Sequence, residues 1–283
     1  MRIVSDVVEM RQEAELLRRT GKKIALVPTM GYLHEGHLRL IEQARRMSDV
    51  VVVSSFVNPM QFGPNEDFSR YPRDFERDKE LALKSGVDVL FTPTREDMFT
   101  AEFGTYVEEQ DASKILEGSI RPNHFRGVTT VVAKLFNICR PHTAVFGQKD
   151  VQQVFIVKKM VHDLNVDVSI VVVPIVREPD GLALSSRNVY LSGAERSNAV
   201  VLNESLKFAE DRIRNGERDV RVLLSHMQRM IVSKGSPVVD YIAFIDPDVF
   251  RVIETIAKPA VLIALAVRFG STRLIDNALI RVE

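Results

Sequence analysis

The sequence predicts an α/β protein in which a doubly wound, mostly parallel sheet is followed by a second, smaller α+β domain. Short β-branched runs alternate with longer amphipathic runs in the first part of the chain, which is typical of a parallel sheet covered by helices. After Pro174 the pattern changes to long polar helical runs and then to strand-like runs. The chain has 283 residues, enough for about two domains.

The predicted strands of the first domain are apolar runs at residues 23–27, 50–57, 87–91, 144–146 and 168–173. The helices predicted between them have apolar residues at helical spacing, at residues 7–19, 37–46, 74–85, 128–139 and 151–164. Strands that alternate with helices imply right-handed crossovers. Such sheets bind ligands at the carboxyl ends of their strands, so the segments that follow the strands are the candidate site.

A second domain is expected to begin near residue 175, because residues 177–181 (REPDG) have strong turn chemistry. The elements expected beyond this turn are two helices and two strands, at residues 194–215, 220–233, 238–245 and 260–269. The predicted division is therefore residues 1–175 and residues 176–283.

Composition and charge exclude several classes of protein. Lys plus Arg equals Asp plus Glu at 38 each, whereas a nucleic-acid-binding protein needs clustered surplus cations. No apolar run reaches the ~20 residues of a membrane span. The N-terminus turns acidic before a signal-peptide core develops. The lone Cys139 excludes an intrachain disulfide and a multi-cysteine zinc site, so we expect a cytoplasmic protein.

The first candidate segment, residues 28–37 (PTMGYLHEGH), follows a predicted strand and opens a helix. Backbone N–H groups at such a position bind phosphate. His34 and His37, with Gly36 between them, suit the stabilisation of charge on a phosphoryl group that is being transferred. A helix-start turn with two surface histidines is the alternative. Zinc is not favoured, because no third ligand lies at metal-site spacing.

The second candidate segment, residues 56–64 (FVNPMQFGP), follows the next predicted strand. The amides of Asn58 and Gln61 bind a hydroxyl or a carboxylate without adding charge. Two prolines hold such a loop in shape before a ligand arrives. An ordinary connecting loop is the alternative.

The third candidate segment, residues 146–153 (FGQKDVQQ), again runs from a strand end into a helix. Lys149 and Asp150 suit phosphate oxygens and ribose hydroxyls, and Gln153 lies one turn further on the same helix face. A helix capped by Asp150 explains the segment equally well.

Two further segments have polar or basic residues suited to anions. Residues 180–188 (DGLALSSRN) place two hydroxyls beside an arginine, which suits a triphosphate, although a hinge with a helix cap is the alternative. Residues 118–127, which include Arg121, His124 and Arg126, are expected to form a stiff basic loop that contacts an anionic substrate.

With these segments in view, the chain resembles the pantothenate synthetase family over essentially its full length. The segments that carry the resemblance are PTMGYLHEGH, FVNPMQF, YPRD, RPNHFRGV, FGQKDVQQ, DGLALSSRN and the closing RLIDN. The His-x-Gly-His pattern alone indicates only the wider group of nucleotidylyltransferases and class I aminoacyl-tRNA synthetases. The resemblance implies a Rossmann-like first domain, a smaller C-terminal lid domain and a homodimer.

The resemblance also implies a reaction in two steps. The carboxylate of (R)-pantoate attacks the α-phosphate of ATP, with Mg²⁺, to give pantoyl adenylate and diphosphate. The amine of β-alanine then displaces AMP. Such a reaction needs no covalent enzyme intermediate, which agrees with the lack of a convincing nucleophile and base pair in the sequence.

The resemblance assigns a role to each candidate residue. The catalytic residues would be His34, His37 and Lys149. Pantoate and β-alanine would contact Gln61, Gln153 and Asn58. The ATP site would comprise Met30, Gly31, Tyr32, Leu33, His34, Glu35, Gly36, His37, Gly147, Gln148, Lys149, Asp150, Val176, Leu184, Ser185, Ser186 and Arg187. Gln148 stands where the family commonly has Glu, so no charge-dependent role is assigned to it. Asp78 and Asp150 are both possible contacts of Mg²⁺.

Two other functions compete with this one. A nucleotidylyltransferase would transfer AMP to a phosphorylated acceptor and stop there, and pantoate dependence of pyrophosphate exchange separates it from the ligase. A nucleotide-binding regulator would keep the fold without the chemistry. The joint presence of histidines, lysine, serines and arginine in these segments disfavours the regulator.

Overall fold

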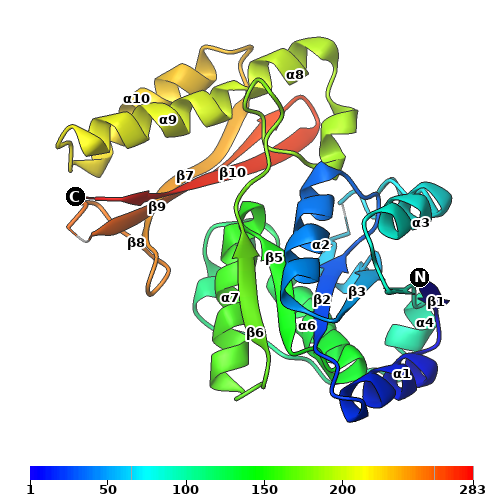
Figure 1. Cartoon of the computed structure of the whole chain (residues 1–283). Helices are drawn as coiled ribbons and strands as arrows, with labels where there is room; N and C mark the ends of the chain where they lie inside the picture. The colour runs from blue at the N-terminus through cyan, green and yellow to red at the C-terminus, as the bar shows by residue number, and fades with distance from the viewer. Residues whose placement is uncertain (65, 258, 283) are drawn as a thin grey trace. The chain divides into compact units, whose positions relative to one another are not determined.

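The computed structural model describes residues 1–64, 66–257 and 259–282, and the chain forms two compact units (Figure 1). The first unit comprises Met1–Gln148 and Gln152–Pro174, and the second comprises Lys149–Val151 and Ile175–Glu283. No helix in the described part of the chain is both long enough and apolar enough to cross a membrane.

The first unit contains a six-stranded parallel sheet with the strand order β1-β4-β3-β2-β5-β6. Its strands are β1 (Arg2–Val4), β2 (Ile24–Thr29), β3 (Val50–Ser55), β4 (Val89–Phe91), β5 (Thr143–Gly147) and β6 (Ser169–Val173). From β2 the chain builds outward through β3 and β4 and then crosses back to β5. The strand order therefore reverses between β2 and β5, where doubly wound sheets bind their ligands. The predicted α/β class is confirmed.

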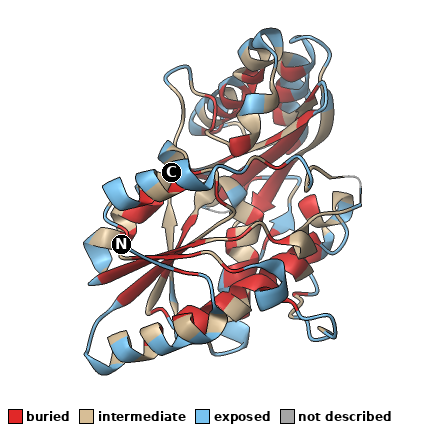
Figure 2. Cartoon of the chain, turned by 90° about the vertical axis from the view of Figure 1, so that its right-hand side faces the viewer, coloured by how far each residue is buried: buried red, intermediate tan, exposed pale blue. Residues whose placement is uncertain are grey.

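Helices cover both faces of this sheet. Successive side chains of each strand point to opposite faces, so each strand contributes to an apolar cluster on both sides. Ile24 and Leu26 share an apolar cluster with residues of α1, α6 and α7, whereas Ala25 and Val27 share another with residues of α2 and α3. The strands are mostly buried, while the helices are buried along one side (Figure 2). The helices are α1 (Val7–Arg19), α2 (Glu35–Met47), α3 (Phe75–Lys84), α4 (Arg95–Met98), α5 (Glu117–Ile120), α6 (His124–Cys139) and α7 (Val151–Asp163), with short 3₁₀ turns η1 (Pro59–Gln61), η2 (Ala112–Lys114) and η3 (Gln148–Asp150).

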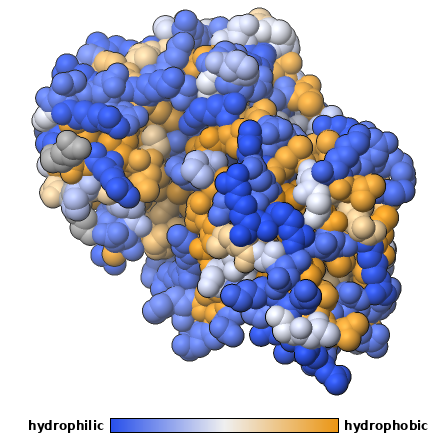
Figure 3. Space-filling view, in the orientation of Figure 1, coloured by the Kyte–Doolittle hydropathy of each residue, from blue (hydrophilic) through white to orange (hydrophobic). Residues whose placement is uncertain are grey.

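The second unit contains a four-stranded antiparallel sheet with the order β10-β9-β7-β8. Its elements are η4 (Ser186–Tyr190), α8 (Gly193–Ala199), α9 (Val201–Arg214), α10 (Val220–Val232), β7 (Val238–Asp246), β8 (Arg251–Val252), β9 (Ala260–Phe269) and β10 (Thr272–Arg281). Residues of α9, α10 and the strands form its apolar core. Hydrophilic side chains predominate over α9 and α10 on the face drawn in Figure 3.

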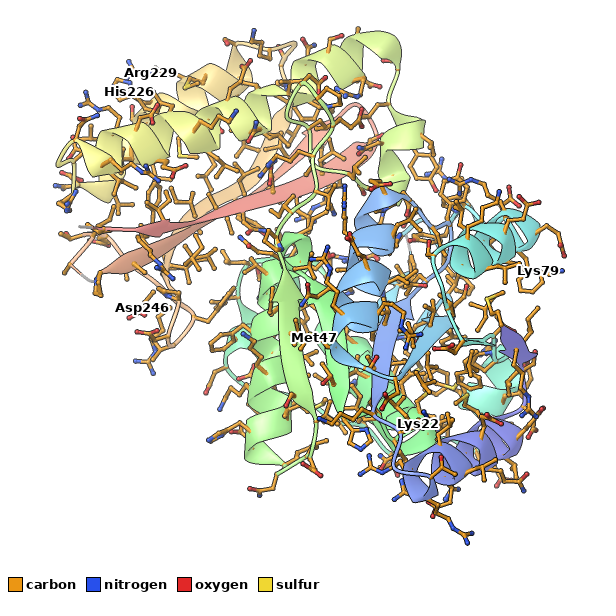
Figure 4. All side chains as sticks on the ribbon, viewed as in Figure 1. Lys22, Met47, Lys79, His226, Arg229 and Asp246 are labelled. Atoms are coloured by element: carbon orange, nitrogen blue, oxygen red, sulfur yellow. The ribbon has the colours of Figure 1, made fainter. Side chains whose placement is uncertain are left out.

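The helix expected over residues 194–215 is divided into α8 and α9. Val200 lies between them and keeps helical backbone angles, φ −58° and ψ −26°. The apolar spacing therefore continues through both helices, so the sequence pattern shows no break. His226 on α10 is exposed, as expected for a histidine on an amphipathic surface helix (Figure 4).

Candidate active site

The loop after β2, residues 30–37, is called the histidine loop below. Gly31 and Tyr32 both have left-handed backbone angles, with φ 77° and φ 51°. A Cβ atom on Gly31 would lie 2.8 Å from Ser55 Oγ, so only glycine fits there. The two left-handed residues turn the backbone N–H groups of Tyr32 and Leu33 to one side, which creates a small anion-binding turn.

The carboxyl group of Asp78 on α3 occupies this turn. Tyr32 N donates to Asp78 Oδ2 at 2.7 Å, and Leu33 N donates to Asp78 Oδ1 at 2.6 Å. Burial raises the pKa of Asp78, while the two N–H donors oppose that rise. Both carboxyl oxygens are engaged by the loop, so Asp78 anchors the histidine loop. The expectation that Asp78 contacts Mg²⁺ stays a prediction.

The two histidines form the capping box at the start of α2. His34 is the N-cap residue and its Nδ1 accepts a hydrogen bond from Gly36 N at 3.2 Å. His37 Nδ1 accepts one from His34 N, also at 3.2 Å. The spacing of three residues therefore satisfies helix-terminal N–H groups that otherwise lack partners. Because both Nδ1 atoms accept, Nε2 is the ring nitrogen that carries a proton, an assignment made from the hydrogen bonds.

The histidine rings lie together, with centroids 4.0 Å apart. Two Nε2–H donors beside a helix N-terminus suit an anion with several oxygens, such as a phosphate. The neighbouring Leu33 has no exposed surface and packs in the core, so its side chain is not available to a ligand. Glu35 forms an ion pair with Arg39 one helical turn on.

The loop after β3, residues 58–61, is called the amide loop below. Asn58 caps η1 by accepting from Met60 N, and its Nδ2 donates to Gln61 Oε1 at 3.1 Å and to Gly127 O at 3.0 Å. Gln61 Nε2 contacts Met30 Sδ at 3.0 Å. The structure therefore brings two of the predicted substrate-binding amides together with a residue of the histidine loop.

Helix α6 packs tightly against the amide loop. A Cβ atom on Gly127 would lie 2.2 Å from Met60 O, so this glycine permits the close approach. His124 Nδ1 lies 2.8 Å from Gln61 O, and because a carbonyl only accepts, Nδ1 is the donor. The other ring nitrogen, Nε2, then accepts from Arg121 Nη1 at 3.2 Å. Burial, together with the charge of Arg121, lowers the pKa of His124 to about 4, so the ring is neutral at pH 7.

The expectation of a basic loop over residues 118–127 is wrong. Most of the segment lies in α5 and α6, and Arg121 makes a bidentate ion pair with Glu66 at 2.8 and 2.6 Å. Burial alone raises the pKa of Glu66, but the hydrogen bonds and charge of Arg121 outweigh it and lower that pKa. The guanidinium of Arg126 lies over the Tyr106 ring. The cations of this segment therefore have partners within the protein, and the loop they support is electrically neutral.

The third candidate segment follows β5. Gly147 ends that strand, which pairs with β6 and with β2, the strand that precedes the histidine loop. Gln148 belongs to the first unit, as does Gln153 on α7, whereas Lys149 and Asp150 belong to the second. Asp150 is exposed, and Lys149 is partly exposed. Lys149 O accepts from Asn277 Nδ2 on β10 at 3.0 Å.

The fourth candidate segment lies in the second unit. Leu184 N donates to Val176 O, which closes a turn that contains Gly181 at φ 100°. Ser185 is the N-cap residue of η4, and its hydroxyl accepts from Arg187 N at 3.3 Å. Ser186 is buried. The predicted helix cap is thus present, and Leu184, Ser185 and Arg187 are partly exposed.

Comparison with known proteins shows the family of this chain. The family model described as pantoate-beta-alanine ligase matches residues 2–279. The chain belongs to this family. "Pantothenate synthetase" from Chloroherpeton thalassium is 53% identical over 285 residues, and that from Acetivibrio thermocellus is 51% identical over 282 residues, each match covering all of both chains. The resemblance inferred from the sequence is confirmed.

Solved structures of the family have the same fold. Pantothenate synthetase from Thermus thermophilus has a TM-score of 0.92 at 44% identity, with 98% of this chain and 99% of that chain covered. A pantoate-beta-alanine ligase from Francisella tularensis, solved with β-γ ATP and β-alanine, has a TM-score of 0.80 at 34% identity, with 99% and 97% covered. The family thus includes a member whose structure holds an ATP compound and β-alanine.

Proposed function

We propose that this chain condenses (R)-pantoate with β-alanine to form pantothenate, with ATP as the energy source. Family membership supports the reaction, and one structural observation supports the mechanism: the loop that carries the two capping-box histidines contacts the neutral amide loop through Met30 and Gln61, at the ends of adjacent strands. This combination suits a substrate with a phosphate and another with a carboxylate and hydroxyls.

The reaction proceeds through an acyl adenylate. A carboxylate oxygen of pantoate attacks the α-phosphorus of ATP, and the bond to the β-phosphate oxygen breaks to release diphosphate. The amine of β-alanine then attacks the acyl carbon of pantoyl adenylate and loses a proton, and AMP leaves. The mixed anhydride supplies the good leaving group that a free carboxylate lacks, so the protein's task is positioning and charge stabilisation.

The proposed roles follow the chemistry of each side chain. His34 and His37 donate from Nε2 to the α-phosphate oxygens as charge builds up there, and Lys149 contacts phosphate oxygens. Gln61 and Gln153 bind pantoate, with Gln61 and Asn58 near β-alanine. The remaining ATP contacts are Met30, Gly31, Tyr32 and Glu35 to Gly36 of the histidine loop, Gly147, Gln148 and Asp150 after β5, and Val176 and Leu184 to Arg187 in the second unit. Leu33 is proposed to contact ATP through its backbone only, because its side chain is buried.

Magnesium is proposed to enter with ATP. Within the described residues, no group of three or more His, Cys, Asp or Glu side chains is placed to hold a metal ion. Mg²⁺ commonly keeps several waters and binds substrate phosphates with one or two carboxylates at most. The residues present would fit that mode, with the exposed Asp150 as a carboxylate that would contact the ion, and the ion would supply positive charge to neutralise the phosphates.

A domain division, an oligomeric state and a cellular location are also proposed. Residues 1–175 are proposed to bind ATP and pantoate and residues 176–283 to act as the lid domain, with Lys149–Val151 and Ile175 grouping with the second unit. The enzyme works as a homodimer. It acts in the cytoplasm, where ATP is supplied.

Product identification tests the reaction directly. Mass spectrometry of the mixture with ATP, pantoate and β-alanine should show pantothenate, AMP and diphosphate, and omission of any substrate should abolish pantothenate. Without β-alanine, exchange of labelled diphosphate into ATP should still require pantoate. Exchange that is independent of pantoate would instead identify a nucleotidylyltransferase, and ATP binding without turnover would identify a regulator.

A further inference from the structure

The closing motif of the chain, RLIDN, has no role in the proposed chemistry, yet its last two residues are nearly inaccessible to solvent. Asp276 and Asn277 on β10 are each 2% exposed. Polar side chains buried to this degree need partners, because an unpaired one costs free energy. Their partners lie on two segments for which ATP contacts are proposed.

Asp276 holds the turn that precedes η4. Arg177 Nη1 donates to Asp276 Oδ2 at 2.6 Å and Arg177 Nη2 to Asp276 Oδ1 at 2.8 Å, a bidentate arrangement. The same guanidinium donates to Gly181 O at 3.1 Å. Arg177 also bridges to Ala183, directly before Leu184. One buried carboxylate therefore holds both sides of the turn that leads into Leu184–Arg187.

Asn277 holds Lys149, which is 128 residues distant in the sequence. Its Nδ2 donates to Lys149 O at 3.0 Å, and its backbone N donates to Asp276 Oδ1 at 2.8 Å. The second contact links the two residues of the motif. Lys149–Val151 also belongs to the second unit, whereas the residues before and after it in the chain belong to the first unit. Asn277 thus provides a side-chain contact between this short segment and the sheet of the second unit.

We propose that Asp276 and Asn277 are positioning residues for ATP, a role that rests on the proposed function. Asp276 sets the conformation of the serine and arginine segment, and Asn277 sets the backbone from which the Lys149 side chain extends. Neither touches a reacting atom. Because they are adjacent on one strand, they place the two segments with respect to each other within the second unit.

The test is a double-mutant cycle between Asn277 and Lys149. Asn277→Ala should raise the dissociation constant of a non-hydrolysable ATP analogue and the KM for ATP about tenfold, the size expected for one buried hydrogen bond. The KM for pantoate should stay within about twofold. If Asn277 acts through Lys149, adding Asn277→Ala to Lys149→Ala should cause no further loss of affinity for the analogue.

Asn215→Ala is the matched control, because Asn215 Nδ2 also donates to a backbone carbonyl in the second unit, that of Asp211, but at an exposed site. It should change neither constant. Asn277→Ser retains a polar side chain that is too short to reach Lys149 O, and it replaces the alanine variant if that variant does not fold. Additive losses in the double variant, equal changes in both KM values, or unchanged affinity in a folded single variant would each overturn the proposal.

Analogue binding by calorimetry needs no turnover, so the two proposals fail separately. Wild-type protein that binds the analogue but makes no pantothenate would overturn the proposed function and leave the cycle measurable. Wild-type protein that makes pantothenate while Asn277→Ala binds the analogue normally would overturn only the positioning role.

Discussion

The histidine loop and the amide loop follow adjacent parallel strands, β2 and β3, but different kinds of group hold them in place. The carboxyl of Asp78 accepts backbone N–H groups of the histidine loop, whereas neutral His124 donates to a backbone carbonyl of the amide loop. Among the residues that support the amide loop, Arg121 forms an ion pair with Glu66, so its charge is balanced. The difference agrees with the proposed function, in which one loop would present donors to a phosphate and the other would present neutral amides to a carboxylate and hydroxyls.

Removing a histidine is the strongest test of this division. We expect His37→Ala to lower kcat a hundredfold or more, about 3 kcal/mol of transition-state stabilisation, with a much smaller change in ATP affinity. The reason is that its donor is aimed at charge that develops during the reaction. Steady-state kinetics and analogue binding measure the two effects, with the exposed His162→Ala as control. Unchanged turnover would remove His37 from the mechanism.

The anchor of the histidine loop should have the next largest effect. In Asp78→Asn, one side-chain oxygen becomes an NH₂ group that faces a backbone N–H, so one buried donor loses its acceptor. We expect a loss of about 2 kcal/mol or more in the free energy of unfolding, because an unpaired buried donor costs roughly 1–3 kcal/mol. A drop in kcat should accompany it, since the loop carries His34.

Urea denaturation and turnover measurements check this expectation, and Glu80→Gln on the exposed side of the same helix provides the matched control. A variant with normal stability and normal kcat would show that the histidine loop keeps its conformation without Asp78. The comparison between the loops would then lose its electrostatic basis.

The pH dependence of stability tests the support of the amide loop. His124 has a pKa of about 4 when folded, against an ordinary value of 6.5. The unfolded chain therefore binds the proton more readily, so this contribution to stability is present above pH 6.5 and is lost as the pH falls toward 4. From about pH 7.5 to about pH 5 the loss should be about 2 kcal/mol.

The control for this effect is the same titration with the histidine removed. His124→Asn retains an amide that can donate to a carbonyl but has no titrating ring, so its free energy of unfolding should fall less over the same pH range. Arg121, Glu66 and Glu117 surround the ring and remain in both proteins. Identical pH profiles for the two proteins would show that His124 is not buried as a neutral ring.

Much of the fold follows from local patterns, and the exceptions have physical reasons. Helix α1 and strand β9 have the predicted bounds, because the pattern of apolar residues in each one continues without a break from end to end. Strand β10 was not predicted, since Asp276 and Asn277 interrupt its apolar run with poor strand formers. Its conformation depends on ten residue pairs with β9, which no local pattern shows.

The same limit applies to the candidate site. The histidine loop and the amide loop are contiguous segments after strands, so sequence reasoning could locate them. Their supports come from far along the chain: Asp78 lies 46 residues from Tyr32, and Glu66 lies 55 residues from Arg121. The sequence alone showed neither that Asp78 anchors the histidine loop nor that Arg121 pairs with Glu66. The charge near a bound substrate depends on which ionised side chains pair with each other. A single sequence does not reveal these ion pairs.

The smallest expected effect is on the KM for pantoate, and it tests whether the two loops bind different substrates. Gln61→Ala and Gln153→Ala should each raise the KM for pantoate about tenfold, the loss expected for one or two hydrogen bonds to a small polar substrate. The KM for ATP should stay within about twofold, because neither amide is assigned to the nucleotide, and Gln12→Ala on the exposed face of α1 should change neither constant. Equal increases for both substrates in Gln61→Ala would mean that the amide loop supports the whole site, and the division between a phosphate loop and a carboxylate loop would then be wrong. Equal increases in Gln153→Ala would remove this residue of α7 from the pantoate site.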